Sequence, residues 1–168
     1  MKRFFDYLPA FAAVALLQSL VFDNLDLGLY ITPLVYPVFL AALPSRIKPW
    51  QMLFVGLLLG VAVDLLAGCP GLHTIASLFT AFCRQGILRL VVGYEVVREG
   101  VIPAPSSIGA GKTFRFLTIL ITIHCITFIS FETLTTAYIY LTLLRIILSS
   151  AVSAIFAFLL LRLIDRRK

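Results

Sequence analysis

The sequence predicts an all-α fold: a polytopic integral membrane protein whose six transmembrane helices form one compact bundle. Of its 168 residues, 61% are hydrophobic and 13% are charged, whereas soluble domains are about half apolar and about a quarter charged. Apolar runs recur along the whole length, and Lys and Arg cluster between the runs and at the carboxyl end. Membrane orientation requires such a distribution. We therefore expect residues 1–168 to form a single transmembrane domain.

Six apolar runs account for the expected helices, because a transmembrane helix needs about 20 mostly apolar residues. They cover residues 4–22, 29–43, 51–67, 72–92, 113–133 and 137–161. The first run has a positive start and no small-residue cleavage site after it, which indicates a retained helix instead of a signal peptide. The second run is short and contains Pro33 and Pro37. We expect it to be kinked or partly unwound, with its freed backbone carbonyls bound by neighbouring helices.

The connections between these runs alternate between basic and non-basic. Lys2 and Arg3 precede the first run, and Arg46 and Lys48 lie between the second and third. The 93–112 connection and the tail are also basic, whereas the remaining connections contain no Lys or Arg. The positive-inside rule then predicts six helices, with both termini and the 93–112 loop in the cytoplasm. A five-helix alternative would put the basic tail outside.

Composition and motif content argue against several classes of function. The net charge of +6 is placed at helix ends, with no basic soluble face interleaved with aromatic residues, so we expect no nucleic-acid binding. Cys69, Cys83 and Cys125 have no CxxC or Cys/His ligand spacing, so we expect packing roles and no metal. No HExxH, no clustered carboxylates and no plausible Ser/His/Asp set occur. We therefore expect no catalytic residue, no cofactor and no enzymatic activity.

One hydrophobic run, VGLLLGVAVDLLAGCPGLH, contains a lone carboxylate. Gly56, Gly60 and Asp64 are spaced i, i+4 and i+8, so they share one helix face. Two glycines at this spacing let a second helix backbone approach closely. A charge at bilayer depth is costly and is normally kept only where the protein provides a partner. We therefore expect Asp64 to point into a helix–helix contact and away from lipid.

The depth of each polar side chain follows from a rise of about 1.5 Å per residue, counted from the cytoplasmic ends of the helices. Asp64 and Gln18 both lie roughly 20 Å deep. His124 lies roughly 16 Å deep and Arg145 about 24 Å deep. Arg84, at about 12 Å, is shallow enough to extend to the surface. The resulting hypothesis is an Asp64–Arg145 ion pair with Gln18 and His124 nearby.

The helix that carries Arg145 also presents a small polar face with Ser149 and Ser153, which is suited to close helix packing. One interpretation of this intramembrane polar site is structural. The other is a transport or proton-relay path, which intramembrane ionisable residues often form. His73 follows the Gly/Pro turn, either as a polar residue that starts a helix or as a contact to a ligand or partner. Arg84 is a second possible contact of that kind.

The run GLLLGVAVDLLAGCPGLHTIASLFTAFCR resembles the rod shape-determining protein MreD family, which is small and polytopic. That family carries a glycine-rich helix, an aspartate, a short glycine-containing turn and then the start of another helix. In this chain these features fall on Gly56, Gly60, Asp64, Gly68, Gly71 and His73. The proline-bearing second run, the total length and the basic tail are also similar to the family's.

The resemblance implies a non-enzymatic subunit of the bacterial cell-elongation complex in the cytoplasmic (inner) membrane, which scaffolds peptidoglycan synthesis and controls cell shape. The implied partners are membrane lipid and MreC, with MreB, RodA and a penicillin-binding transpeptidase in the wider complex. The family's fold is also similar to the S components of energy-coupling-factor transporters. The alternative function is therefore a substrate-binding subunit of a small-molecule (vitamin) transporter. A transport subunit needs a polar, ligand-sized cavity near its outer side, whereas a scaffold has a collapsed interior or a lipid-facing groove.

Overall fold

The computed structural model describes residues 7–25, 28, 30–69, 71–133 and 139–166. In chain order its helices are α1 (Leu8–Leu20), the 3-10 turn η2 (Phe22–Asn24), α2 (Pro37–Ala41), α3 (Pro49–Ala67), α4 (Leu72–Val92), α5 (Tyr94–Glu99), α6 (Pro105–Ile108), α7 (Ala110–Thr133) and α8 (Ile139–Asp165). Within the described residues the regular structure is entirely helical, with no strand. The all-α prediction is confirmed for that part of the chain.

Four helices, α3, α4, α7 and α8, are long and apolar enough to cross a membrane. They contain 19, 21, 24 and 27 residues. A helix needs about 20 residues to cross the hydrocarbon core, so each of the four is long enough. α4 begins and ends at the predicted residues, whereas the predicted start of the last run at Ala137 lies outside the described residues. Large apolar side chains such as Leu65 and Leu90 are exposed on these helices, as expected of surfaces that face lipid.

Within the described residues, the first two expected spans do not form long helices. α1 has 13 residues, about 20 Å of helix, which is shorter than the roughly 30 Å hydrocarbon core. The predicted starts at Phe4 and Leu29 lie outside the described residues. Residues 30–36 are irregular and only Pro37–Ala41 are helical, so the predicted unwinding of the second run is confirmed. The described structure therefore supports four spanning helices in place of the six expected.

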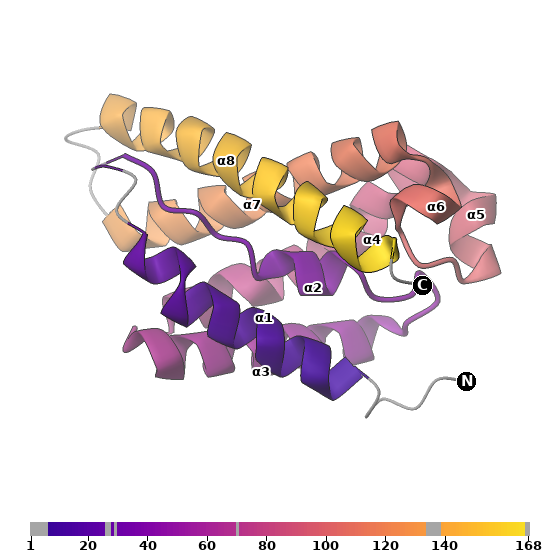
Figure 1. The fold of residues 1–168 in the computed structure, drawn as a ribbon, viewed down its shortest axis with the longest axis horizontal. Helices are drawn as coiled ribbons and strands as arrows, with labels where there is room; N and C mark the ends of the chain where they lie inside the picture. Colours follow the sequence, from indigo (N-terminus) through magenta and orange to yellow (C-terminus); the bar gives the residue numbers. More distant parts are fainter. Residues whose placement is uncertain (1–6, 26–27, 29, 70, 134–138, 167–168) are drawn as a thin grey trace.

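The short helix α2 lies at the centre of the bundle. Figure 1 shows it between α7 and α8 on one side and α1 and α3 on the other. Neighbouring pairs around it are α1 with α3, α3 with α4, α4 with α7, and α7 with α8. Every residue of α2 is buried. The proline-containing run thus supplies the core around which the longer helices pack.

The bundle has two ends of opposite charge. α1, α3 and α7 run in one direction along the long axis, and α4 and α8 run in the other (Figure 1). Arg46 and Lys48 directly precede α3 and Arg98 belongs to α5, so the end where α3 begins (Figure 1) is called the basic end. Asp23 belongs to η2 and Glu132 to the end of α7, so the opposite end is called the acidic end. The charge alternation along the sequence therefore becomes a separation of charge in space.

The 93–112 connection, expected to be a loop, contains the two short helices α5 and α6, and its last three residues belong to α7. Proline starts α6, at a position where the missing N–H is not needed. Ser106 ties this segment to the end of α8, because its N–H and its hydroxyl donate to the two carboxylate oxygens of Asp165 at 2.9 and 2.6 Å. The connection is therefore packed against the basic end.

Candidate functional site

The contact between α3 and α4 depends on two glycines. A Cβ added at Gly56 would lie 2.8 Å from the Cβ of Ala81, and one added at Gly60 would lie 2.9 Å from the carbonyl oxygen of His73. Cβ atoms in real proteins do not approach other atoms so closely, so only glycine permits this separation of the two helices. The predicted close packing at Gly56 and Gly60 is confirmed.

Asp64, near the end of α3, binds the first turn of α4. Its Oδ1 accepts a hydrogen bond from the His73 N–H at 3.0 Å, and its Oδ2 accepts one from the Thr74 N–H at 2.9 Å. The Thr74 hydroxyl donates to Oδ2 at 2.6 Å. The first N–H groups of a helix have no partner within it, and the N-cap residue Gly71 has no side chain to supply one. Asp64 supplies that acceptor, and its negative charge suits the positive end of the helix dipole.

The hypothesis of an Asp64–Arg145 pair is wrong. Arg145 Nη1 lies 2.8 Å from Glu132 Oε2. Its Nη2 donates to Glu132 Oε1 at 3.2 Å and to Thr32 Oγ1 at 3.0 Å. Depth counting gives the height of a residue along the bundle axis but not the direction in which its side chain points. Asp64 points toward α4 and Arg145 toward the end of α7, so similar depths did not bring the two charges together.

A buried group of side chains, which we call the Tyr36 cluster, consists of Tyr36, His73, Ser77, Thr80 and His124. The Tyr36 hydroxyl lies 3.1 Å from His73 Nδ1 and accepts a hydrogen bond from the Ser77 hydroxyl at 3.3 Å. The ring of Tyr36 also makes edge-on contacts with His73 at 5.4 Å and His124 at 5.0 Å. The cluster therefore joins the unwound segment before α2 to both α4 and α7.

Both histidines are interior residues. The ring of His73 is buried and packs against Phe128 with 4.6 Å between centroids, so it lines no outer mouth open to a ligand or partner. It is the second residue of α4, as the helix-starting interpretation predicts. His124 Nδ1 lies 2.9 Å from the Thr80 hydroxyl. The expectation of His124 beside Asp64 is corrected, because its partner comes from the middle of α4 and not from α3.

Arg84 is fully buried, so the expected extension to the surface does not occur. Its Nη2 donates to the carbonyl oxygens of Ala41, at 3.2 Å, and of Leu43. Ala41 is the last residue of α2 and Leu43 lies two residues beyond it, where a helix leaves acceptors without internal partners. The next residue, Gln85, donates to the Ser45 carbonyl at 3.0 Å. Arg84 and Gln85 of α4 therefore both bond the backbone that leaves α2. These bonds explain why the Arg84 guanidinium lies in the interior and not at the surface.

Gln18 of α1 bonds the unwound segment, residues 30–36, and does not accompany Asp64 as expected. Its Nε2 donates to the Pro33 carbonyl at 3.0 Å, and its Oε1 accepts from the Val35 N–H at 2.8 Å. Helix α1 faces this segment, whereas Asp64 points toward α4. One amide side chain thus satisfies a donor and an acceptor of the irregular backbone.

Ser149 and Ser153 of α8 bond the other side of residues 30–36. The Ser149 hydroxyl accepts from the Thr32 N–H at 3.0 Å, and the Ser153 hydroxyl accepts from the Leu34 N–H at 2.8 Å. Irregular backbone at membrane depth is tolerated only where protein groups satisfy it. The small polar face predicted for helix packing therefore also acts as a row of hydrogen-bond partners, mainly for N–H groups. The Ser149 hydroxyl also donates to the Tyr30 carbonyl at 3.5 Å, as expected for a freed carbonyl.

Several residues of the site were not predicted: Tyr36, Thr74, Ser77, Thr80 and Glu132. A sequence signal existed for part of the Tyr36 cluster. His73, Ser77, Thr80 and Arg84 are spaced i, i+4, i+7 and i+11, so they form a polar stripe on one face of α4. All four are buried. The sequence signal for Tyr36 was weaker: the residue lies in the proline-containing run that was already expected to unwind.

The chemistry of the site is hydrogen bonding and packing within the chain. Among the described residues, no three His, Cys, Asp or Glu side chains gather in a way that would hold a metal ion. The three cysteines are free. Burial, and to a lesser degree the negative charge of Asp64, raises the pKa of the Cys69 thiol in the α3–α4 turn. That thiol therefore stays protonated at neutral pH.

These features define a class of protein: an all-helical membrane protein whose buried polar side chains mainly bond its own backbone and one another. In comparisons with known proteins, no family model, no curated protein and no solved structure matches this chain. The similarity of the bundle to transporter S components accordingly stays a prediction, as does membership of the MreD family.

Proposed function

We propose that this chain is a non-enzymatic membrane subunit of a bacterial cell-elongation complex, which scaffolds peptidoglycan synthesis by binding MreC. MreB, RodA and a penicillin-binding transpeptidase would belong to the wider assembly. The observation that supports the proposal is the α3–α4 hairpin. Gly56, Gly60 and Asp64, on which the resemblance to MreD rests, all contact the first half of α4. The resembling residues thus form one structural unit.

The closed interior supports a scaffold more than a transport subunit. Asp64, His73 and His124 are each bonded within the chain and buried. A vitamin-binding subunit requires a polar, ligand-sized cavity near its outer side. The groove between α1 and α3 is instead lined chiefly by apolar side chains. A lipid-facing groove of this kind is what the scaffold interpretation expects.

Isolation of the tagged full-length chain from its native membranes in a mild detergent tests the proposal. MreC should co-purify, and it should be absent when an unrelated tagged polytopic protein is isolated from the same strain. Depletion of the chain should turn rod-shaped cells round, and the wild-type gene should restore the rods. Recovery of an ATPase module with a bound vitamin, in place of MreC, would overturn the scaffold and establish the transport alternative.

The proposed location is the bacterial cytoplasmic membrane, with the basic end in the cytoplasm, because Lys and Arg are retained on that side. Asn24 and Arg98 are exposed at opposite ends of the bundle. In a chain without native cysteines, a membrane-impermeant maleimide applied to intact cells should label Asn24→Cys and leave Arg98→Cys unlabelled until lysis. Labelling of Arg98→Cys before lysis would contradict this orientation.

A further inference from the structure

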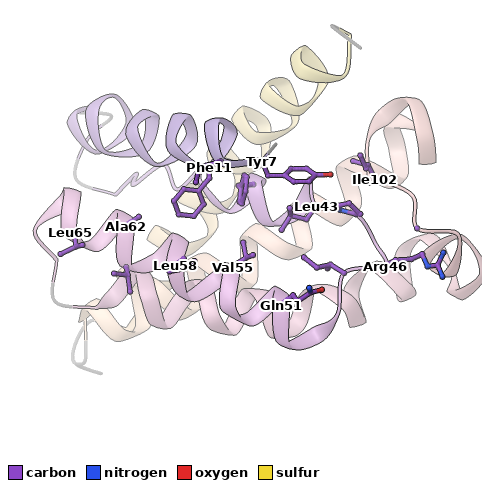
Figure 2. A pocket seen from close by; sticks show the side chains of 16 residues that line it. Tyr7, Phe11, Leu43, Arg46, Gln51, Val55, Leu58, Ala62, Leu65 and Ile102 are labelled. Atoms are coloured by element: carbon purple, nitrogen blue, oxygen red, sulfur yellow. The ribbon is translucent and has the colours of Figure 1, made fainter. Parts of the chain in front are cut away.

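An apolar groove of about 800 Å³ lies between α1 and α3. Figure 2 shows Tyr7, which directly precedes α1, and Phe11 of α1 above Leu58 and Leu65 of α3. Arg46 lies at the opposite end of the groove from Leu65. A pocket of this size is large enough to enclose a drug-sized apolar molecule. Leu58 and Leu65 are exposed along it, so in a bilayer this groove opens toward lipid.

Arg46 is the only charged residue among the sixteen that line the groove. Its stem lies against Gly100, where an added Cβ would come within 2.6 Å of Arg46 Cδ. Gly100 also has a φ of +83°, which favours glycine. Among the described residues the Arg46 guanidinium has no hydrogen-bond or ion-pair partner. Because Gly100 has no Cβ, the unpaired Arg46 side chain can lie at the basic end of the apolar groove.

A second polar side chain also lines the groove. Gln51 lies nearer to the Arg46 end than to the Leu65 end (Figure 2), and its Oε1 accepts the Lys48 N–H at 3.3 Å. Its amide NH2 is therefore left as a donor. A guanidinium and an amide NH2 both donate hydrogen bonds, and an arginine in particular matches the paired oxygens of a phosphate group. The end of the groove is thus suited to an anion, while its length is suited to a hydrocarbon chain.

We propose that this groove binds one anionic phospholipid, with an acyl chain along α1 and α3 and its phosphate at Arg46. Lipid tails are as apolar as the groove itself. Contacts with the tail therefore fill the groove but do not favour one lipid species over another. The preference must come from the headgroup, and anionic lipids are attracted to basic residues at the membrane surface. A transmembrane segment of a partner protein would fill the groove but would leave Arg46 unpaired unless it carried an acid at that depth.

Native mass spectrometry of the delipidated full-length chain, titrated with phosphatidylglycerol or phosphatidylcholine, measures the binding. One phosphatidylglycerol should be retained at least tenfold more tightly than phosphatidylcholine. Arg46→Gln should remove that preference, whereas Arg98→Gln, which removes an exposed arginine outside the groove, should keep it. Leu58→Trp should fill the groove and weaken retention of both lipids about tenfold. Leu57→Trp is the matched control, because Leu57 is similarly exposed on α3 but does not line the groove.

A crosslinking experiment on the wild-type chain does not depend on the folding of any variant. Phosphatidylglycerol with a photoactivatable group in its acyl chain should crosslink mainly to the groove residues of α1 and α3. Equal retention of both lipids by the wild-type chain, equal losses in Arg46→Gln and Arg98→Gln, or crosslinks spread over the exposed face of α8 would each overturn the proposal. So would recovery of a helical peptide in the groove after purification without added lipid.

Discussion

Asp64 and Thr74 join the end of one spanning helix to the start of the next, through two hydrogen bonds to a single carboxylate oxygen. The Thr74 N–H donates to Asp64 Oδ2 at 2.9 Å and the Thr74 hydroxyl donates to it at 2.6 Å. Asp64 as a residue is 6% exposed, so its carboxylate is largely shielded from solvent. An acid that would be costly in lipid is thus the cap of α4, which is otherwise capped only by glycine.

Asp64→Ala should lower the free energy of unfolding by about 1 to 3 kcal/mol, because it leaves two backbone N–H groups at the start of α4 without acceptors. Asp64→Asn should cost less, since one oxygen remains. Thr74→Val should also cost less, because only the hydroxyl bond is lost. Unfolding by SDS in mixed micelles measures all three. An Asp64→Ala chain as stable as the wild type would show that the cap contributes nothing.

Gly60→Ala should destabilise the α3–α4 hairpin, because the new methyl group would meet the backbone of α4. Overpacking of this kind costs about 1 to 3 kcal/mol. Gly86→Ala on α4 is the matched control, since a Cβ there has nothing within 4 Å. Replacing a helical glycine by alanine in open space is neutral or stabilising by about 0.5 to 1 kcal/mol. In detergent, the unfolding midpoint of Gly60→Ala should therefore fall below that of the wild type, whereas the midpoint of Gly86→Ala should stay the same or rise.

Ser149→Ala and Ser153→Ala should each lower stability, because each removes the acceptor of a backbone N–H in the unwound segment. Hydrogen bonds between membrane-embedded groups contribute about 0.6 kcal/mol on average and about 1.7 at most. Ser150→Ala is the control on the same helix, since the Ser150 hydroxyl bonds only the backbone of its own helix. Equal effects at all three serines would mean that the contacts with residues 30–36 carry no specific energy.

A pair of double-mutant cycles should separate the observed ion pair from the rejected one. Glu132→Gln and Arg145→Gln should show a coupling of about 0.2 to 1 kcal/mol, because both side chains are partly exposed. Asp64→Asn and Arg145→Gln should be additive, as expected of sites without shared partners. Chemical unfolding of the single and double variants gives both values. A coupling larger for Asp64 with Arg145 than for Glu132 with Arg145 would restore the rejected pair.

Much of the local structure followed from the sequence alone. Hydropathy located α4 at its observed ends, because an apolar run between polar turns leaves few alternatives in lipid. Pro33 and Pro37 predicted the unwound second run, since each lacks an N–H and disrupts a helix. The spacing of Gly56 and Gly60 predicted a close helix contact, because residues four apart share a face.

The partners of the polar side chains followed only from packing in three dimensions. Asp64 is bonded by two backbone N–H groups and a hydroxyl nine and ten residues later. A backbone N–H belongs to almost every residue type, so the sequence does not show which ones lack a partner. The heights of Gln18 and Arg145 along their helices left open which way each side chain points. Those directions follow from packing around the irregular backbone of residues 30–36. The side chains of α1 and α8 that bond this backbone must face it.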